Sequence, residues 1–106
     1  MRKTLILCCV IFISACSSTI QTASISKAYK TYEANQFEQT LKHITRAENA
    51  RETTSEQKAE YTYLKAQTYE GLGQNKNAVT LYEYLKENHS SSQYGHLASK
   101  KLEQKR

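Results

Sequence analysis

Residues 66–85 read AQTYEGLGQNKNAVTLYEYL, and this stretch decides the fold. Apolar residues recur at i, i+3, i+4 and i+7 over residues 78–85, which is the spacing of one helix face. An earlier helical pattern, carrying Ala66 and Tyr69, stops before Gly73. Glycine readily adopts the left-handed backbone that ends a helix, and so short a turn forces the two helices to lie antiparallel. The stretch therefore predicts a helical hairpin with Gly73 at its tip.

A similar pattern occurs earlier in the chain. Sliding the chain against itself until Asn35-Gln36 lies on Gly73-Gln74 also aligns Ala28 with Ala66 and Ile44 with Tyr82. Asparagine tolerates left-handed geometry, so Asn35 can end a helix as glycine does. The chain is therefore expected to contain two similar hairpins.

Five segments in all carry helical spacing, and none carries sustained strand alternation. Their expected limits are residues 22–35, residues 37–47, a third from a Thr53-x-x-Glu56 capping box to Gly71-Leu72-Gly73, a fourth ending near Asn88, and a fifth after Ser90-Ser91-Ser92. The sequence thus predicts an all-α chain in which a single helix follows the two hairpins.

The composition narrows the possible functions. The 106 residues include no Pro, no Trp and no Asp, and all ten acidic residues are Glu. A chain of this length holds one small domain, which excludes a large multidomain enzyme. A Ser-His-Asp triad cannot be built without aspartate, and no glycine-rich phosphate loop or paired-carboxylate pocket is present. We therefore expect no catalytic activity and no cofactor.

The N-terminal stretch that ends at Cys16 has the order of a secretory signal. Arg2 and Lys3 give a positive start, residues 5–13 are apolar, and Ser14-Ala15 supply the small residues that a signal peptidase requires. The same stretch resembles the lipobox of bacterial lipoproteins. That resemblance implies a cleaved signal peptide at residues 1–15, an acylated Cys16 with a short tether at residues 16–22, and a folded domain at residues 23–106.

The lipobox resemblance also implies where the protein is located and that the mature chain has no free thiol. Ser17 stands where an aspartate would favour retention in the inner membrane, so we expect anchoring in the outer membrane on the periplasmic face, or in the cell membrane of an envelope that has no outer membrane. Cys8 and Cys9 would be discarded with the signal, which leaves no thiol for metal or redox chemistry. The mature chain would carry a charge of about +3, too little to argue for nucleic-acid binding. His43, His89 and His96 are expected to be surface residues without a metal.

Around the second hairpin the residues resemble the tetratricopeptide repeat (TPR) family, whose unit is a pair of helices. The matching positions hold small residues where helices approach closely, aromatic residues between them and a turn glycine: Ala28, Ala66, Tyr69, Gly73, Ala78 and Tyr82. The family's early tryptophan is replaced by Thr62. The resemblance implies a helical-hairpin solenoid of about two repeats plus a C-terminal capping helix.

In the TPR family the first helix of each repeat lines the inner surface. That placement implies a tyrosine-rich binding groove made of Tyr29, Tyr32, Tyr63, Gln67, Tyr94 and Lys101. Ile25, Glu70 and Leu97 would face the same way. Tyrosine buries a large rigid ring and offers a hydroxyl, so it is favoured in protein interfaces. In the alternative interpretation these tyrosines only pack against neighbouring helices.

We therefore expect a lipid-anchored, non-catalytic interaction module, acting as an adaptor or accessory subunit of an envelope assembly or secretion complex. Its partner would be an envelope protein or a second copy of the chain, because solenoids usually need about three repeats for stability. The alternative is a periplasmic lipoprotein that binds cell wall or a small ligand.

Overall fold

The computed structural model describes residues 22–50 and 53–105, and all regular structure in them is helical. The chain forms an N-terminal helix, described over residues 22–33, and then α2 (Phe37–Glu48), α3 (Ser55–Gly71), α4 (Asn75–Asn88) and α5 (Gln93–Gln104). The prediction of an all-α chain is confirmed for the described residues. The predicted signal peptide, Cys16 and most of the tether lie outside them.

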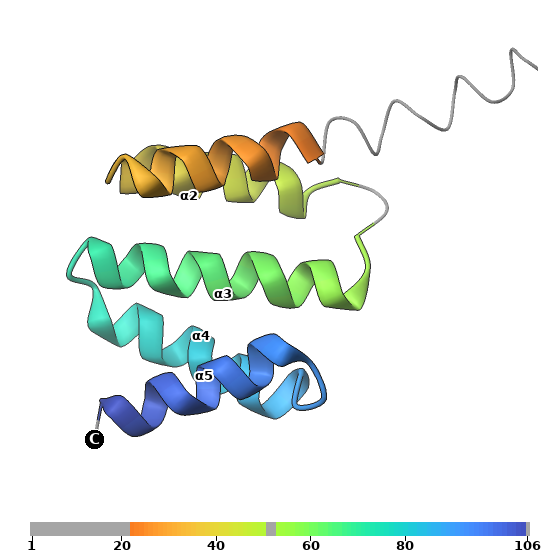
Figure 1. Cartoon of the computed structure of the whole chain (residues 1–106), viewed down its shortest axis with the longest axis vertical. Coiled ribbons are helices and arrows are strands. Elements are labelled where there is room, and N and C mark those ends of the chain that lie inside the picture. The colour runs from red at the N-terminus through yellow and green to blue at the C-terminus, as the bar shows by residue number, and fades with distance from the viewer. Residues whose placement is uncertain (1–21, 51–52, 106) are drawn as a thin grey trace, which may run out of the picture.

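Each helix packs against its neighbours in the chain, and α3 also contacts α5. Figure 1 shows the N-terminal helix beside α2, then α3, then α4 with α5 across it. Because α3 contacts α2, α4 and α5, it is the element through which the two hairpins are joined.

The two hairpin tips have the same backbone conformation. Asn35 and Gly73 have positive φ angles of 61° and 76°, and the residue after each, Gln36 or Gln74, has φ −91° and ψ 65°. The Gln36 and Gln74 amides donate to the carbonyls of Thr31 and Tyr69, each at 2.8 Å. The repeat seen in the sequence therefore extends to the backbone geometry of both turns.

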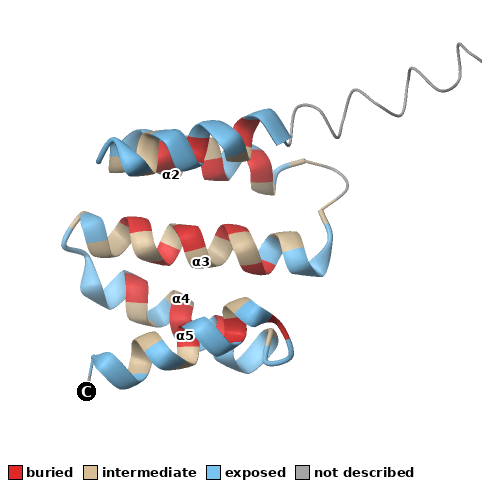
Figure 2. Cartoon of the chain, in the orientation of Figure 1, coloured by how far each residue is buried: buried red, intermediate tan, exposed pale blue. Residues whose placement is uncertain are grey.

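Two clusters of buried side chains form the core. One lies between the N-terminal helix, α2 and α3, and it contains Ala28, Ile44, Ala47, Tyr61 and Leu64. The other lies between α3, α4 and α5, and it contains Ala59, Ala66, Ala78, Tyr82, Leu85 and Ala98. Figure 2 shows the buried positions on the sides of the helices that face each other. The completely buried alanines leave room for close helix packing.

The start of α3 differs from the prediction by one residue. The capping box is formed by Thr54 and Gln57, and the prediction that Thr53 and Glu56 form it was wrong. The Thr54 hydroxyl accepts the Gln57 amide at 3.1 Å, and the Gln57 side chain accepts the Thr54 amide at 2.9 Å. The Thr53 hydroxyl instead donates to the Ala50 carbonyl at 2.9 Å. Adjacent threonines compete for such a cap, and here the second one takes it.

The turn from α4 to α5 depends on one serine and one glycine. Ser92 caps α5 by accepting the Tyr94 amide at 3.2 Å, and it also donates to Glu56 of α3 at 3.1 Å. The backbone of Gly95 lies directly against the His89 carbonyl, so that no side chain fits between them. These contacts fix the position of α5, and therefore of Tyr94, relative to α3.

Candidate functional site

Four of the predicted groove residues lie near one another, on a surface that we call the tyrosine face: Tyr29 and Tyr32 from the N-terminal helix, Tyr63 from α3 and Tyr94 from α5. The Tyr63 ring centroid is 5.8 Å from that of Tyr94. The Tyr29 hydroxyl donates to Glu60 of α3 at 2.7 Å. The face therefore spans three helices, and α3 lies at its centre.

The tyrosines of this face are both packed and accessible. Tyr63 and Tyr94 are half-buried against the second core cluster, and the Tyr63 ring centroid lies 5.8 Å from that of Tyr82. Tyr32 packs against the first cluster and meets the Phe37 ring edge-on at 5.7 Å. Tyr29 keeps 38% of its surface exposed. Each ring thus packs against neighbouring residues, while the face as a whole stays partly open.

Lys101, the predicted cation of the groove, faces a carboxylate of the protein itself. The Lys101 Nζ atom lies 3.9 Å from Oε1 of Glu70, and the Lys105 Nζ atom lies 3.9 Å from Oε2 of the same residue. Glu70 also accepts a short hydrogen bond from the Tyr82 hydroxyl. Two lysines and one tyrosine thus surround Glu70, so this end of the face offers little free charge. Sequence reasoning did not find the Tyr82–Glu70 bond, because the two residues lie on different helices and their spacing matches no motif.

The remaining predicted residues have simpler positions. Gln67 is half-buried on α3, one helical turn after Tyr63. Ile25 packs against the first cluster, and Leu97 of α5 is 38% exposed.

Three tyrosines of the face, Tyr29, Tyr63 and Tyr94, have a raised pKa. Burial, followed by the hydrogen bond to Glu60, raises the pKa of Tyr29 well above its ordinary value of 10.0. Burial also raises the pKa of Tyr63 and of Tyr94, with a further contribution from nearby carboxylates. These three phenols therefore remain neutral at pH 7 and able to donate a hydrogen bond.

Glu60 and Glu56 give the other end of the face an acidic character. Within the described residues neither carboxylate forms an ion pair, and their partners are the neutral hydroxyls of Tyr29 and Ser92. This end can therefore attract a cationic or hydrogen-bond-donating group, and its aromatic rings can pack against that group.

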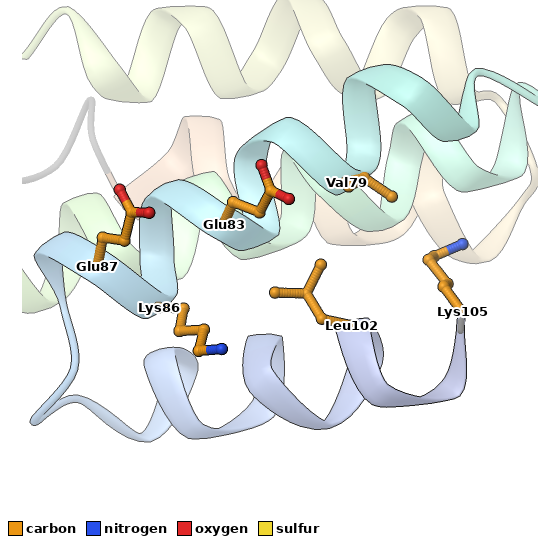
Figure 3. Close-up of a pocket in the computed structure, with 6 residues that line it drawn as sticks. All are labelled: Val79, Glu83, Lys86, Glu87, Leu102 and Lys105. Atoms are coloured by element: carbon orange, nitrogen blue, oxygen red, sulfur yellow. The ribbon is translucent and has the colours of Figure 1, made fainter.

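The structure also contains clefts away from the tyrosine face. One, of about 330 Å³, lies between α4 and α5 and is lined by Val79, Leu102, Glu83, Glu87, Lys86 and Lys105. Figure 3 shows its two apolar side chains with charged residues around them. A second cleft, of about 430 Å³, lies between the N-terminal helix and α2. Neither is lined by a tyrosine of the face.

In the part of the chain that the structure describes, no three His, Cys or Glu side chains are grouped so that they could hold a metal ion. His43 lies on α2, His89 ends α4, and His96 lies on α5. Within the same residues no helix is both long and apolar enough to cross a bilayer. Comparisons with models of protein families, with curated proteins and with solved structures found no match.

Proposed function

We propose that the chain is a lipid-anchored, non-catalytic interaction module of a bacterial envelope, and that the tyrosine face binds a protein partner. The anchoring rests on the lipobox-like sequence that ends at Cys16. The arrangement of two like hairpins and one further helix agrees with a TPR-like solenoid. The proposal also includes a role as an adaptor or accessory subunit of an envelope assembly or secretion complex.

The observation that carries the binding role is the pairing of half-exposed tyrosines with unneutralised carboxylates. Tyr63 and Tyr94 pack against the second core cluster, and the Tyr29 hydroxyl donates to Glu60 of α3. The contact of Ser92 with Glu56 fixes the start of α5, so these rings are held in place without a partner. A preorganised aromatic surface loses little side-chain entropy on binding. Glu56 and Glu60 favour a partner segment that carries Lys or Arg, because such a segment would supply the cations that the face lacks.

The test is site-specific photo-crosslinking in living cells. A benzophenone amino acid replaces Tyr29 in one strain and Tyr84 in another. Tyr84 is the matched control, since it is an exposed tyrosine, 46% accessible, on the opposite hairpin helix α4. We expect one envelope protein to crosslink at position 29 and not at position 84. Equal patterns from both positions, or none from either, would contradict a specific protein-binding face.

Two further experiments test the lipid anchor and the cell-wall alternative separately. Cys16→Ala should move the protein out of the membrane fraction, and unchanged membrane recovery would remove the lipid anchor from the proposal. Binding to purified peptidoglycan that is lost with Tyr29→Ala, in the absence of any protein crosslink, would favour the alternative of a cell-wall ligand.

A further inference from the structure

The cleft between the N-terminal helix and α2 has the chemistry of an anion site. It has a volume of about 430 Å³ and is lined by Ala23, Ser24, Lys27, His43, Arg46 and Asn49. Three of these side chains carry, or can carry, positive charge, and the other polar ones can donate hydrogen bonds. Among the described residues, none that lines the cleft is acidic.

The fixed cations of this cleft are unpaired in the part of the chain that the structure describes. Neither Lys27 nor Arg46 takes part in an ion pair there. The Nδ1 atom of His43 is buried and makes no hydrogen bond within the same set. A buried polar atom without a partner is uncommon in proteins and calls for a specific explanation.

In the second hairpin the equivalents of Lys27 and Ala23 both contact the preceding helix α2. In the alignment of the two hairpins Lys65 corresponds to Lys27, and the Lys65 Nζ atom is 2.9 Å from a carboxylate oxygen of Glu48 on α2. Tyr61 corresponds to Ala23, and it is buried there against Ile44 and Ala47. The preceding helix α2 thus supplies both an anion and an apolar surface to the second hairpin.

At the first hairpin the described chain contains no preceding helix that could do the same. The apolar position is occupied by the small Ala23, which leaves space, and Arg46 adds a second fixed cation. The lysine is kept while no described residue supplies its carboxylate partner, and an anion from outside the chain would complement the two cations. Arginine favours phosphate because its planar group donates two parallel hydrogen bonds.

We propose that this cleft binds the phosphate of a membrane phospholipid headgroup. The choice of source rests on the proposed function: the cleft begins at Ala23, and an acylated Cys16 would hold it close to the bilayer, since the short tether between them spans at most about 20 Å. The start of the N-terminal helix and the end of α2 lie at the same end of the molecule (Figure 1). A headgroup phosphate there would orient the domain on the membrane.

The test uses the protein as purified from the membranes of cells that express it, in nonionic detergent. Dihexanoyl phosphatidylglycerol is titrated while the imidazole resonances of His43 are followed by NMR. We expect saturable shifts, and Lys27→Gln with Arg46→Gln should weaken binding by about 25-fold, roughly fivefold for each cation removed. The control Lys58→Gln with Lys100→Gln removes the same charge from exposed positions on α3 and α5 and should weaken binding less than twofold.

Several results would overturn the proposal. Equal weakening by both double variants would indicate diffuse surface charge. Equal affinity for a sulfonate lipid would remove the preference for phosphate, and equal affinity for inorganic phosphate would remove the headgroup as the source.

Mass spectrometry of the same sample distinguishes a failure of the proposed cleft from a failure of the proposed lipid anchor. An acylated protein that fails to bind contradicts the cleft alone, whereas an unacylated Cys16 contradicts the anchor and with it the membrane source.

Discussion

The backbone of Gly95 in α5 lies so close to the carbonyl of His89 that a β-carbon on Gly95 would overlap that oxygen. The neighbouring atom belongs to the main chain of the α4–α5 turn, so it cannot rotate away as a side chain could. The position of α5 therefore depends on the absence of a side chain at residue 95.

Gly95→Ala is expected to destabilise the domain by about 3 kcal/mol, the upper range for overpacking of a filled core. Urea unfolding followed by circular dichroism measures this change. Gly71→Ala is the comparison, because its β-carbon would meet the Phe37 ring at 2.5 Å and that side chain can shift. A smaller loss for Gly95→Ala than for Gly71→Ala would contradict the rigid contact.

Substitutions at the hairpin tips are expected to change the stability of the domain only through the backbone angles of Asn35 and Gly73. Asn35→Gly is expected to be neutral or slightly stabilising, whereas Asn35→Ala and Gly73→Ala should each cost about 1–2 kcal/mol, because both positions have positive φ. Nothing lies within 4 Å of a β-carbon at Gly73, so steric overlap makes no contribution there. If Gly73→Ala unfolds at the same urea concentration as the parent chain, this interpretation fails.

The Tyr82–Glu70 contact should make stability fall at alkaline pH. Burial, followed by the hydrogen bond to Glu70, raises the pKa of Tyr82 above its ordinary value of 10.0, so the folded chain holds the phenolic proton more tightly than the unfolded chain does. This contribution to stability is complete below about pH 10, and above it falls by up to about 1.4 kcal/mol per pH unit.

Tyr82→Phe should therefore flatten the decline in stability above pH 10, and it should also lower stability at pH 7 because the hydrogen bond is lost. Urea unfolding at a series of pH values measures both effects. Tyr84→Phe, on the same helix but exposed, should leave the pH profile unchanged. Identical profiles for the two variants would show that Tyr82 is not the group responsible.

The position of the N-cap of α3 can be tested by comparing substitutions at two adjacent residues. Thr54→Ala is expected to cost about 1 kcal/mol, the usual loss for an N-cap hydroxyl. Ser55→Ala changes the first residue inside the helix and should cost much less. Chemical denaturation compares the two variants, and equal losses would argue against Thr54 as the cap.

The sequence was most informative where a single residue type meets a strict backbone requirement. Asn35 and Gly73 marked both turns because few residues adopt positive φ, and Ser92 marked the start of α5. The capping box was misplaced by one residue because Thr53 and Thr54 are chemically equivalent. Helical spacing alone did not reveal that Tyr61 belongs to the first core, since its burial depends on how α3 lies against α2.

The candidate site was predictable in outline only. Helical spacing and the repeat pattern placed the tyrosines of the face on three helices, and the structure brings Tyr63 and Tyr94 together. The pairing of Lys101 and Lys105 with Glu70 depends on side-chain conformation and on the angle of α5. The cationic cleft escaped prediction because its residues are separated in the sequence and match no motif.

Because the two hairpin tips have the same geometry, the hydrogen-exchange rate of one tip can serve as a reference for that of the other. The amides of Gln36 and Gln74 donate over the same 2.8 Å to equivalent carbonyls, so their hydrogen-exchange rates can be compared within one sample at one pH and temperature. After correction for the preceding residue, a difference between the rates measures how much more readily one hairpin opens than the other. Any such difference would come from the side chains and neighbours of each hairpin, because the backbone of the two tips has the same conformation.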